Sequence, residues 1–367
     1  MSVRQTLTVK LLVSIFRRIR LRSGPAKLPR NLSRVAVACT GGVGDILLCT
    51  PAIRAIKEIY PQCRLTAIVN YKRTDMLRFN PWIDELLPFR KSPFHCAKIL
   101  RRLKAEPPEV VLLFSTNDPY MYALSALACP GGLVGYQGKN PLAFLLGKSI
   151  AFEDRFHVIR NNLNLVSMIG ARTENMEMNL RLGKEVEGAA DFFLNRSDET
   201  RYRVGFQLGS GFVKKCWPIS KYAELGNRLM DRLNARIVLL ASPREKTLAN
   251  ELNQALNGRA VPAITDLLTA GEIIRNLDLL VTPDTGPMHM AFALQCPTVA
   301  LFGPSHPKNY GYLGSSARHV IIHKPPFDGP YVKLSRGYED LMDRISPDEV
   351  FDAAVELLTT HPKNKGK

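Results

Sequence analysis

Short apolar runs alternate along this chain with longer amphipathic stretches, and this alternation restricts the fold more than any other feature. Strands that are apolar throughout are buried on both faces, and amphipathic helices between them supply the crossovers that parallel strands need. We therefore predict an α/β fold built on parallel sheets. At 367 residues the chain is long enough for two such domains, each with a full core.

The expected elements form two series, divided by a polar stretch at 195–201. In the first series we expect strands at Val35–Cys39, Leu65–Val69, Val110–Phe114 and Leu133–Tyr136, and helices at Ile46–Ile59, Phe94–Lys104, Tyr120–Ala128 and Phe156–Met168. In the second we expect strands at Val204–Gln207, Ile237–Leu240, Leu279–Val281 and Thr298–Phe302, and helices at Lys221–Leu233, Arg244–Leu256, Gly271–Asn276 and Met288–Leu294. The predicted domains are 34–195 and 202–340, with an N-terminal arm at 1–33. A last helix at 345–360 is expected to pack back on the first domain.

Two strand–turn–helix segments carry candidate chemistry, one in each predicted domain. The segment Thr282-Pro-Asp-Thr-Gly-Pro-Met-His289 places an acid, a glycine and a histidine where a strand turns into a helix. Backbone amides at such a helix N-terminus favour a phosphate. The second segment, Thr40-Gly-Gly-Val-Gly-Asp45, follows the first strand. Two sites of this kind predict a ligand held between two domains.

The net charge of +17 is concentrated in three segments. Residues 1–34 carry nine Lys or Arg and no acid, Arg90 to Lys104 carries six and no acid, and 361–367 carries three. The N-terminal bases are interleaved with apolar residues, so this arm is suited to lie on an anionic membrane surface, although a solvated arm is an alternative. Its uncharged run Leu11 to Phe16 is far shorter than the ~20 residues that span a bilayer.

The cysteines and histidines indicate neither a disulfide framework nor a metal site. Seven cysteines lack CxxC spacing, and the histidines show no spacing typical of metal ligands. Buried free thiols in a reducing cytoplasm are the expected state. We predict that the protein holds no metal and no cofactor.

Four motifs together resemble glycosyltransferase family 9, the lipopolysaccharide heptosyltransferases. In chain order they are Gly41-Gly-Val-Gly-Asp45 with Pro51-Ala52-Ile53, Lys215-Cys-Trp-Pro218, Asp284-Thr-Gly-Pro-Met-His289, and Leu301-Phe-Gly-Pro304. Each motif is modest by itself, but four in this order and spacing are specific, and the resemblance covers roughly residues 34–358. It implies a GT-B fold, in which two Rossmann-like domains face a cleft.

The resemblance also implies an activity and a location. The expected reaction is metal-independent transfer of heptose from ADP-heptose to the lipopolysaccharide core, with inversion at the sugar. The acceptor would be an anionic glycolipid, lipid A with its growing core. The expected location is cytoplasmic, peripheral on the inner face of the cytoplasmic membrane. Arg101, Arg102 and Lys104 would supply electrostatic attraction for the acceptor and the membrane.

On the acceptor side, Asp45 is the candidate catalytic base, because inverting transfer needs a group that takes the proton of the acceptor hydroxyl. The alternative is that Asp45 only caps the helix that follows it. Gly42 and Gly44 belong to the acceptor-side loop, where glycine lets the backbone turn tightly and approach the substrate.

On the donor side, Lys215 is the candidate cation for the departing diphosphate. The set of expected donor-binding residues is completed by Ser210, Gly211, Glu245, Asp284, Thr285, Gly286 and His289. Glu245 would hold the ribose, Asp284 the sugar hydroxyls, and Thr285 and Gly286 the phosphates through their amides. His289 would line the cleft, and its alternative is a hydrogen bond within the core.

Three other functions stay open at this point. A member of the same family could use another nucleotide sugar. An NAD(P)-dependent oxidoreductase would fit a glycine turn after a first strand, but Gly41-Gly-Val-Gly-Asp45 does not match G-x-G-x-x-G. A nucleic-acid-binding protein is suggested by charge alone, and its bases would not be expected to be segregated in this way. We expect no nucleic-acid partner.

Overall fold

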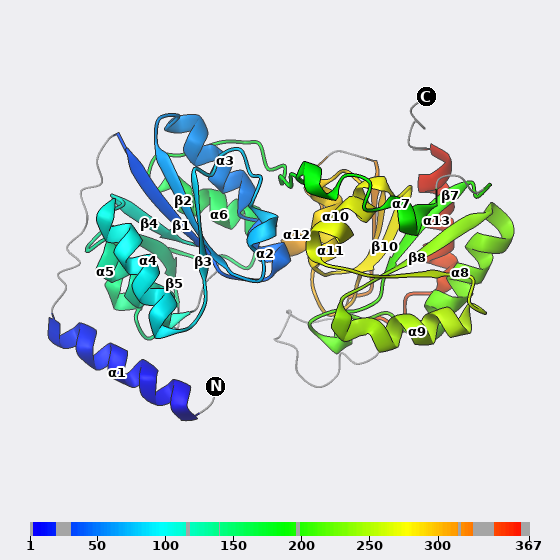
Figure 1. Cartoon of the computed structure of the whole chain (residues 1–367), viewed down its shortest axis with the longest axis horizontal. Helices are drawn as coiled ribbons and strands as arrows, with labels where there is room; N and C mark the ends of the chain where they lie inside the picture. The colour runs from blue at the N-terminus through cyan, green and yellow to red at the C-terminus, as the bar shows by residue number, and fades with distance from the viewer. Residues whose placement is uncertain are drawn as a thin grey trace. The chain divides into compact units, whose positions relative to one another are not determined.

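The computed structural model describes residues 3–19, 31–114, 118–138, 140–195, 199–314, 317–325 and 341–360. The chain forms two compact units, Met1–Met178 and Asn179–Lys367 (Figure 1). Each unit contains one six-stranded sheet, and every strand pair in both sheets is parallel. The α/β class predicted from the alternation of apolar runs is therefore confirmed.

The first unit has the strand order β3-β2-β1-β4-β5-β6. Its strands are β1 (Arg34–Cys39), β2 (Arg64–Asn70), β3 (Glu85–Phe89), β4 (Val110–Leu113), β5 (Leu133–Gln137) and β6 (Lys148–Ala151). Its helices are α1 (Val3–Ile19), α2 (Val43–Leu47), α3 (Thr50–Ile59), α4 (Pro93–Ala105), α5 (Pro119–Ala128) and α6 (Val158–Ser167). The central strands β1 and β4 are almost wholly buried, as expected of parallel strands covered on both faces.

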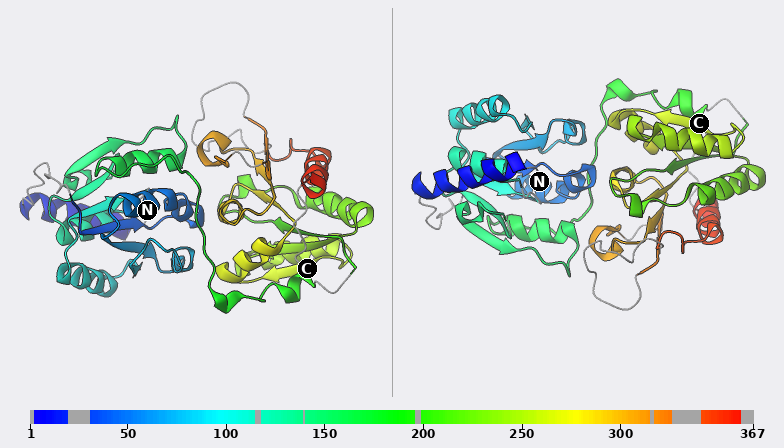
Figure 2. Two further views of the ribbon diagram at one scale, coloured as in Figure 1. Left: turned by 90° about the horizontal axis from the view of Figure 1, so that it is seen from above. Right: turned by 90° about the horizontal axis from the view of Figure 1, so that it is seen from below.

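The second unit repeats this arrangement with the order β12-β11-β10-β7-β8-β9. Its strands are β7 (Tyr202–Gln207), β8 (Ala235–Ala241), β9 (Val261–Ile264), β10 (Leu279–Pro283), β11 (Thr298–Phe302) and β12 (His319–His323). Its helices are α7 (Asp191–Leu194), α8 (Ile219–Leu233), α9 (Lys246–Ala255), α10 (Leu267–Asn276), α11 (Gly286–Ala293), α12 (Pro307–Tyr310) and α13 (Pro347–Thr360). Figure 2 shows helices on both faces of each sheet.

The boundary between the units differs from the predicted one. The sequence analysis extended the first domain to residue 195, but α7 contacts α10, β8 and β9 of the second unit. Two side-chain bonds fix it there, since Arg203 donates to the backbone oxygen of Leu194 and Arg236 to that of Phe193. The boundary therefore falls at 178/179, ahead of the polar stretch 195–201, of which residues 196–198 lie outside the described ranges.

The last helix also differs from its expected place. We expected 345–360 to pack back on the first domain, whereas α13 packs against α8 and against β10, β11 and β12. Its apolar residues Val350, Ala354 and Leu357 join the core of the second unit. The Trp217 indole donates to the backbone oxygen of Ile345 at 3.1 Å and ties the preceding turn to the same core.

The expected helix Ile46–Ile59 is two helices. The helix is interrupted at Leu48 and Cys49, and α3 begins at Thr50 with Pro51 in its first turn. Proline is well accommodated in the first turn of a helix, where its missing N–H group has no partner to lose, but not in the interior. Pro51 is thus the residue in the sequence that marks the start of the second helix.

The N-terminal arm contains a helix that packs on the first unit. The Phe16 side chain of α1 is buried, and Leu12 and Val13 pack partly against the same apolar cluster, which α4 and α5 also form. Because these residues pack against the first unit, the arm is not simply a solvated tail over residues 3–19. The outer side of α1 remains apolar and basic, with Leu11 60% and Ile15 40% exposed.

Candidate functional site

The turn after β1 holds the carboxylate of Asp45 against its own loop. The Gly42 amide donates to Asp45 Oδ2 at 2.7 Å, which is the reciprocal bond of a helix capping box. Asp45 therefore helps to cap α2 from the third position of the helix, whereas the alternative interpretation placed it before a helix that follows it. The bond occupies Oδ2 only, so capping and a second role at Oδ1 are compatible.

The position of the Asp45 carboxylate requires a glycine at position 41. A Cβ atom at position 41 would lie 2.5 Å from Asp45 Oδ2 and 2.6 Å from Asp45 Cβ, whereas one at position 42 would lie 3.4 Å from Oδ2. The sequence analysis named Gly42 and Gly44 for the acceptor-side loop. In the structure Gly41 makes room for the carboxylate, and Gly42 donates to it.

A buried hydrogen-bond chain supports the break between α2 and α3, directly behind Asp45. The Asn162 amide donates to the backbone oxygen of Leu48 at 3.0 Å, and its oxygen accepts from the Tyr136 hydroxyl at 2.9 Å. The Cys49 thiol donates to the Asp45 backbone oxygen at 3.0 Å. Burial raises the pKa of Cys49 and of Tyr136, so both stay protonated as donors. Sequence reasoning missed Asn162, because a single asparagine within a helix carries no motif.

In the second unit, the turn between β10 and α11 brings three predicted donor residues together. Asp284 is 6% exposed at the end of β10, and the Lys215 Nζ atom lies 2.6 Å from its Oδ2. The His289 Nε2 atom lies 3.8 Å from Asp284 Oδ1, with His289 3% exposed. A buried carboxylate is stable only with such partners. The arrangement concentrates one anion and two nitrogen groups at the N-terminus of α11.

Thr285 and Gly286 stand where the sequence analysis expected them, at the start of α11. Thr285 is the N-cap residue and Gly286 is the first residue of the helix. The first backbone amides of α11, a helix of eight residues, have no partner within the helix and point out of its N-terminus. This terminus is also the positive end of the helix dipole. Such an end suits a phosphate or another anion.

The loop after β7 carries Ser210, Gly211 and Lys215. The Ser210 hydroxyl accepts from the Phe212 amide at 3.2 Å, and a Cβ at Gly211 would meet nothing within 4 Å. The Lys215 Nζ atom lies 5.9 Å from the ring centres of both Phe212 and Tyr310. Phe212 is 59% exposed. Lys215 thus stands between an exposed apolar loop and the buried Asp284.

Glu245 reaches the same loop from the start of α9. Its Oε2 accepts from the Ser242 amide at 2.8 Å in a second capping box. A Cβ atom added to Gly209 would overlap this carboxylate, so Glu245 packs directly over the loop backbone. The structure therefore places Glu245 beside Ser210 and Gly211 while giving it a capping role.

Trp217 has a structural role. Its indole is buried and contacts Tyr222 edge-on, with ring centres 4.8 Å apart. Pro218 is the N-cap residue of α8. The pair fixes where α8 begins and hence where the loop that carries Lys215 ends.

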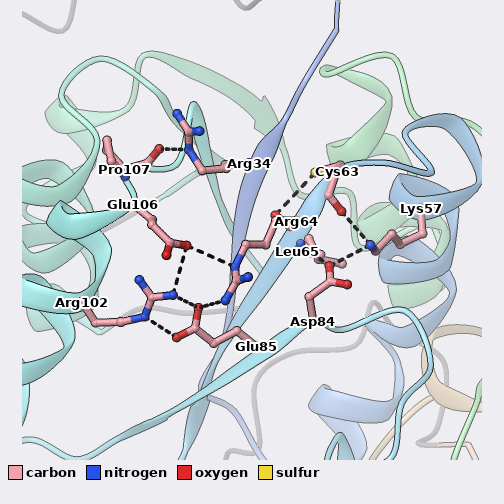
Figure 3. Close-up of polar contacts among 10 residues, drawn as sticks. All are labelled: Arg34, Lys57, Cys63, Arg64, Leu65, Asp84, Glu85, Arg102, Glu106 and Pro107. Atoms are coloured by element: carbon pink, nitrogen blue, oxygen red, sulfur yellow. Dashed lines mark hydrogen bonds and ion pairs between the residues drawn. The ribbon is translucent and has the colours of Figure 1, made fainter.

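The three bases predicted on α4 differ in their surroundings. Arg102 donates to both carboxylate oxygens of Glu85, at 2.6 and 2.9 Å, and to Glu106 at 3.1 Å (Figure 3). Glu106 and Glu85 raise the pKa of Arg102 above its ordinary value. The charge of Arg102 is thus compensated within the fold. Arg101 and Lys104 are exposed and form no ion pair with any residue in the described ranges.

The described residues contain neither a cluster of metal ligands nor a helix that could span a membrane. Within those ranges no group of three His, Cys, Asp or Glu residues is arranged to hold a metal ion. Within the same ranges no helix combines the length and the apolar character needed to cross a bilayer. All seven cysteines are free.

Two parallel six-stranded α/β units, each with a strand–turn–helix site, define the class of a GT-B protein. The sequence profile described as glycosyltransferase family 9 (heptosyltransferase) matches residues 133–328. The chain belongs to this family.

Curated relatives carry names of the same kind. Lipopolysaccharide heptosyltransferase 2 of Salmonella typhimurium is 32% identical over 177 residues, which are 46% of this chain and 50% of that protein. The corresponding protein of Escherichia coli is 32% identical over 181 residues, 47% of this chain and 52% of that protein. The chain thus spans about half the length of these two relatives.

Solved structures agree on the fold. A glycosyl transferase family 9 protein from Veillonella parvula superposes with a TM-score of 0.76 at 21% identity, covering 91% of this chain and 99% of that one. At this level of identity the similarity establishes the GT-B architecture and not the substrate.

Proposed function

We propose that this protein transfers heptose from ADP-heptose to the lipopolysaccharide core, with inversion and without a metal ion. The observation that carries the proposal is the pair formed by Lys215 and Asp284 at the N-terminus of α11, in a chain that belongs to the heptosyltransferase family. The names of the relatives, lipopolysaccharide heptosyltransferases, support the choice of sugar and acceptor.

The second unit would bind the donor. Lys215 and the amides of Thr285 and Gly286 would stabilise the diphosphate as it leaves, because cationic and N–H groups stabilise the charge that develops there. Asp284 holds Lys215 in place through their ion pair. It would also accept hydrogen bonds from hydroxyl groups of the sugar. Ser210, Gly211 and Glu245 would contact the nucleotide portion, and His289 would complete the wall of the site.

The first unit would supply Asp45 as the base. In an inverting transfer the acceptor hydroxyl attacks the anomeric carbon, the bond to the diphosphate breaks, and the hydroxyl proton passes to a carboxylate. Asp45 Oδ1 accepts no hydrogen bond from a described residue, whereas Oδ2 is held by Gly42. Fixing one oxygen and leaving the other available suits this role, since a base must be held in a defined orientation.

The acceptor proposed is the anionic glycolipid lipid A with its growing core, at the inner surface of the cytoplasmic membrane. The basic segments 1–34 and Arg90 to Lys104 support this part of the proposal through their charge. Arg101 and Lys104 are exposed and remain available for such contacts, whereas Arg102 is engaged with Glu85 and Glu106.

The test is calorimetric binding of ADP-heptose, ADP, UDP and NAD to the full chain without metal, followed by transfer to a purified lipid A–core acceptor. We expect preference for ADP and ADP-heptose, at least tenfold weaker in Lys215→Ala and in Asp284→Asn. Lys214→Ala is the matched control, since it removes the neighbouring charge and should retain most of the affinity. Preference for UDP, or for NAD, would overturn the assignment of the donor.

Asp45→Asn separates binding from chemistry. It keeps the shape of the side chain, so ADP-heptose binding in the second unit should be unchanged. Transfer should fall by roughly 100- to 10,000-fold, the usual contribution of a general base. Near-normal transfer by Asp45→Asn would leave Asp45 with its capping role alone.

A further inference from the structure

The first unit contains a groove between the edge strand β3 and helix α4. Its volume is about 520 Å³, and its lining residues are Leu87, Pro88, His95, Lys98, Ile99, Arg101, Arg102 and Ala105. Each α4 member has another member three or four residues away, as in His95, Ile99 and Arg102, so they lie along one side of the helix. The groove lies outside the turn that carries Asp45, and it includes Arg101, one of the bases that the proposed function assigns to the membrane and the acceptor.

The floor of the groove is apolar. Leu87 and Pro88 come from β3, and Ile99 and Ala105 from α4. As an edge strand, β3 has a neighbour on one side only, β2. An apolar hollow of this size on the surface marks a binding site more often than a defect of packing.

The rim is cationic. Lys98 and Arg101 are exposed and form no ion pair with any part of the chain that the structure describes. Arg102 differs, because Glu85 and Glu106 hold it as a wall of the groove (Figure 3). Two uncompensated charges therefore stand at one side of an apolar hollow. This combination suits a ligand with an apolar body and an anionic end.

Helix α1 presents similar chemistry on the same face of the sheet. It joins α4 and α5 in one apolar cluster, which places all three on one side of the first sheet. Its exposed residues include Leu11 and Ile15 beside the bases Lys10, Arg17 and Arg18. An exposed surface that alternates apolar and basic side chains is typical of proteins that lie on anionic membranes.

We propose that the groove between β3 and α4 binds an anionic phospholipid of the membrane surface, with an acyl chain along Leu87, Ile99 and Ala105 and the phosphate between Lys98 and Arg101. A free phosphate would leave the apolar floor unused, and a neutral lipid would leave the bases unused. The inference rests on the proposed association with a membrane, but not on the transfer reaction. It assigns that association to a defined site.

The test measures binding of the full chain to vesicles by sedimentation. Vesicles of phosphatidylcholine with phosphatidylglycerol should bind the protein, and vesicles of phosphatidylcholine alone should not. Each base near an anionic surface contributes about fivefold to the affinity, so Lys98→Gln/Arg101→Gln should weaken binding about 30-fold. Arg172→Gln/Lys184→Gln is charge-matched, both residues are exposed and neither lines the groove, so this pair should bind within about twofold of the parent.

A second variant tests the groove itself without changing charge. Ala105→Trp fills it from an exposed position at the end of α4 and should weaken binding at least tenfold. In solution, lysophosphatidylglycerol below its micelle concentration should bind the parent, and glycerol phosphate or an acidic amphipathic peptide should not compete for it.

The opposite results overturn the inference. An equal loss of vesicle affinity in the groove double variant and in the control double variant would indicate non-specific electrostatic attraction. Unchanged vesicle binding by Ala105→Trp would mean that no lipid occupies the groove on the membrane. Competition by glycerol phosphate or by the peptide would assign the site to another ligand. ADP binding is measured on every variant and should not change, so a failed donor assignment remains distinguishable from a failed lipid site.

Discussion

Replacing Gly41 by alanine should displace Asp45 while leaving the rest of the first unit intact. The new Cβ would stand 2.5 Å from Asp45 Oδ2 and 2.8 Å from its Cγ, distances that real Cβ atoms do not adopt. The obstacle includes Asp45 Cβ at 2.6 Å, so rotation of the carboxylate alone does not relieve the overlap. Either the side chain or the loop backbone must move, and the bond from the Gly42 amide is lost.

The size of the effect follows from that bond and from the proposed role of Asp45. A hydrogen bond to a charged group contributes roughly 1.5–3 kcal/mol, so the melting temperature should fall by about 5 °C for a unit of this size. Misplacing a catalytic group by about 1 Å costs on the order of 100-fold in rate. We therefore expect a modest loss of stability together with a loss of about 100-fold in kcat.

The assay is ADP release from ADP-heptose with a lipid A–core acceptor, with calorimetry of ADP binding as a control for the second unit. Gly42→Ala is the neighbouring control, since its Cβ would lie at 3.4 Å and needs little adjustment. Gly138→Ala, in the same unit and with nothing within 4 Å of the added Cβ, controls for the substitution alone. The reasoning is refuted if Gly41→Ala keeps full activity, or if Gly42→Ala loses as much.

Two further predictions concern buried groups. Asn162→Leu leaves the Leu48 oxygen and the Tyr136 hydroxyl without their partner, so urea unfolding should show a loss of about 3 kcal/mol, against about 1 kcal/mol for Tyr136→Phe; equal losses would contradict the role of Asn162. Burial lowers the pKa of His319 to about 4, so the unfolded chain takes up a proton first below pH 6.5. Stability should therefore fall as pH drops from 6.5 to 4, and His319→Phe should reduce that slope by about 1 kcal/mol per pH unit; an unchanged slope would show that His319 is not buried as a neutral ring.

The sequence revealed the central strands and missed the edge strands. All eight predicted strands are present, whereas β3, β6, β9 and β12 were not predicted, and these four are the outer strands of the two sheets. Their residues are mostly half-buried, so they lack the unbroken apolar runs by which buried parallel strands are recognised. Unbroken apolar runs identify only strands that are covered on both faces, so this pattern could not reveal the edge strands.

For the site, the sequence likewise predicted some of the residues but not the contacts that form only after folding. Lys215 was named from one motif and Asp284 and His289 from another, and the structure brings these three together. Their roles in the reaction stay predictions. Asn162 and the special place of Gly41 could not be read from the sequence, because both depend on which atoms approach each other after folding. The compensation of Arg102 by Glu85 depends likewise on a contact between an edge strand and a helix.

The packing of α13 has a consequence for the order in which the chain acquires its structure. The first sheet is complete once residue 151 has been synthesised, and its helices end at Ser167. The second core lacks Ile345, Val350 and Leu357 until the last helix leaves the ribosome, and the Trp217 indole has no acceptor before then. During synthesis the unit with Asp45 can therefore fold early, while the one with Lys215 and Asp284 must wait with an open apolar surface. The second unit therefore exposes apolar surface, which chaperones recognise, for longer than the first.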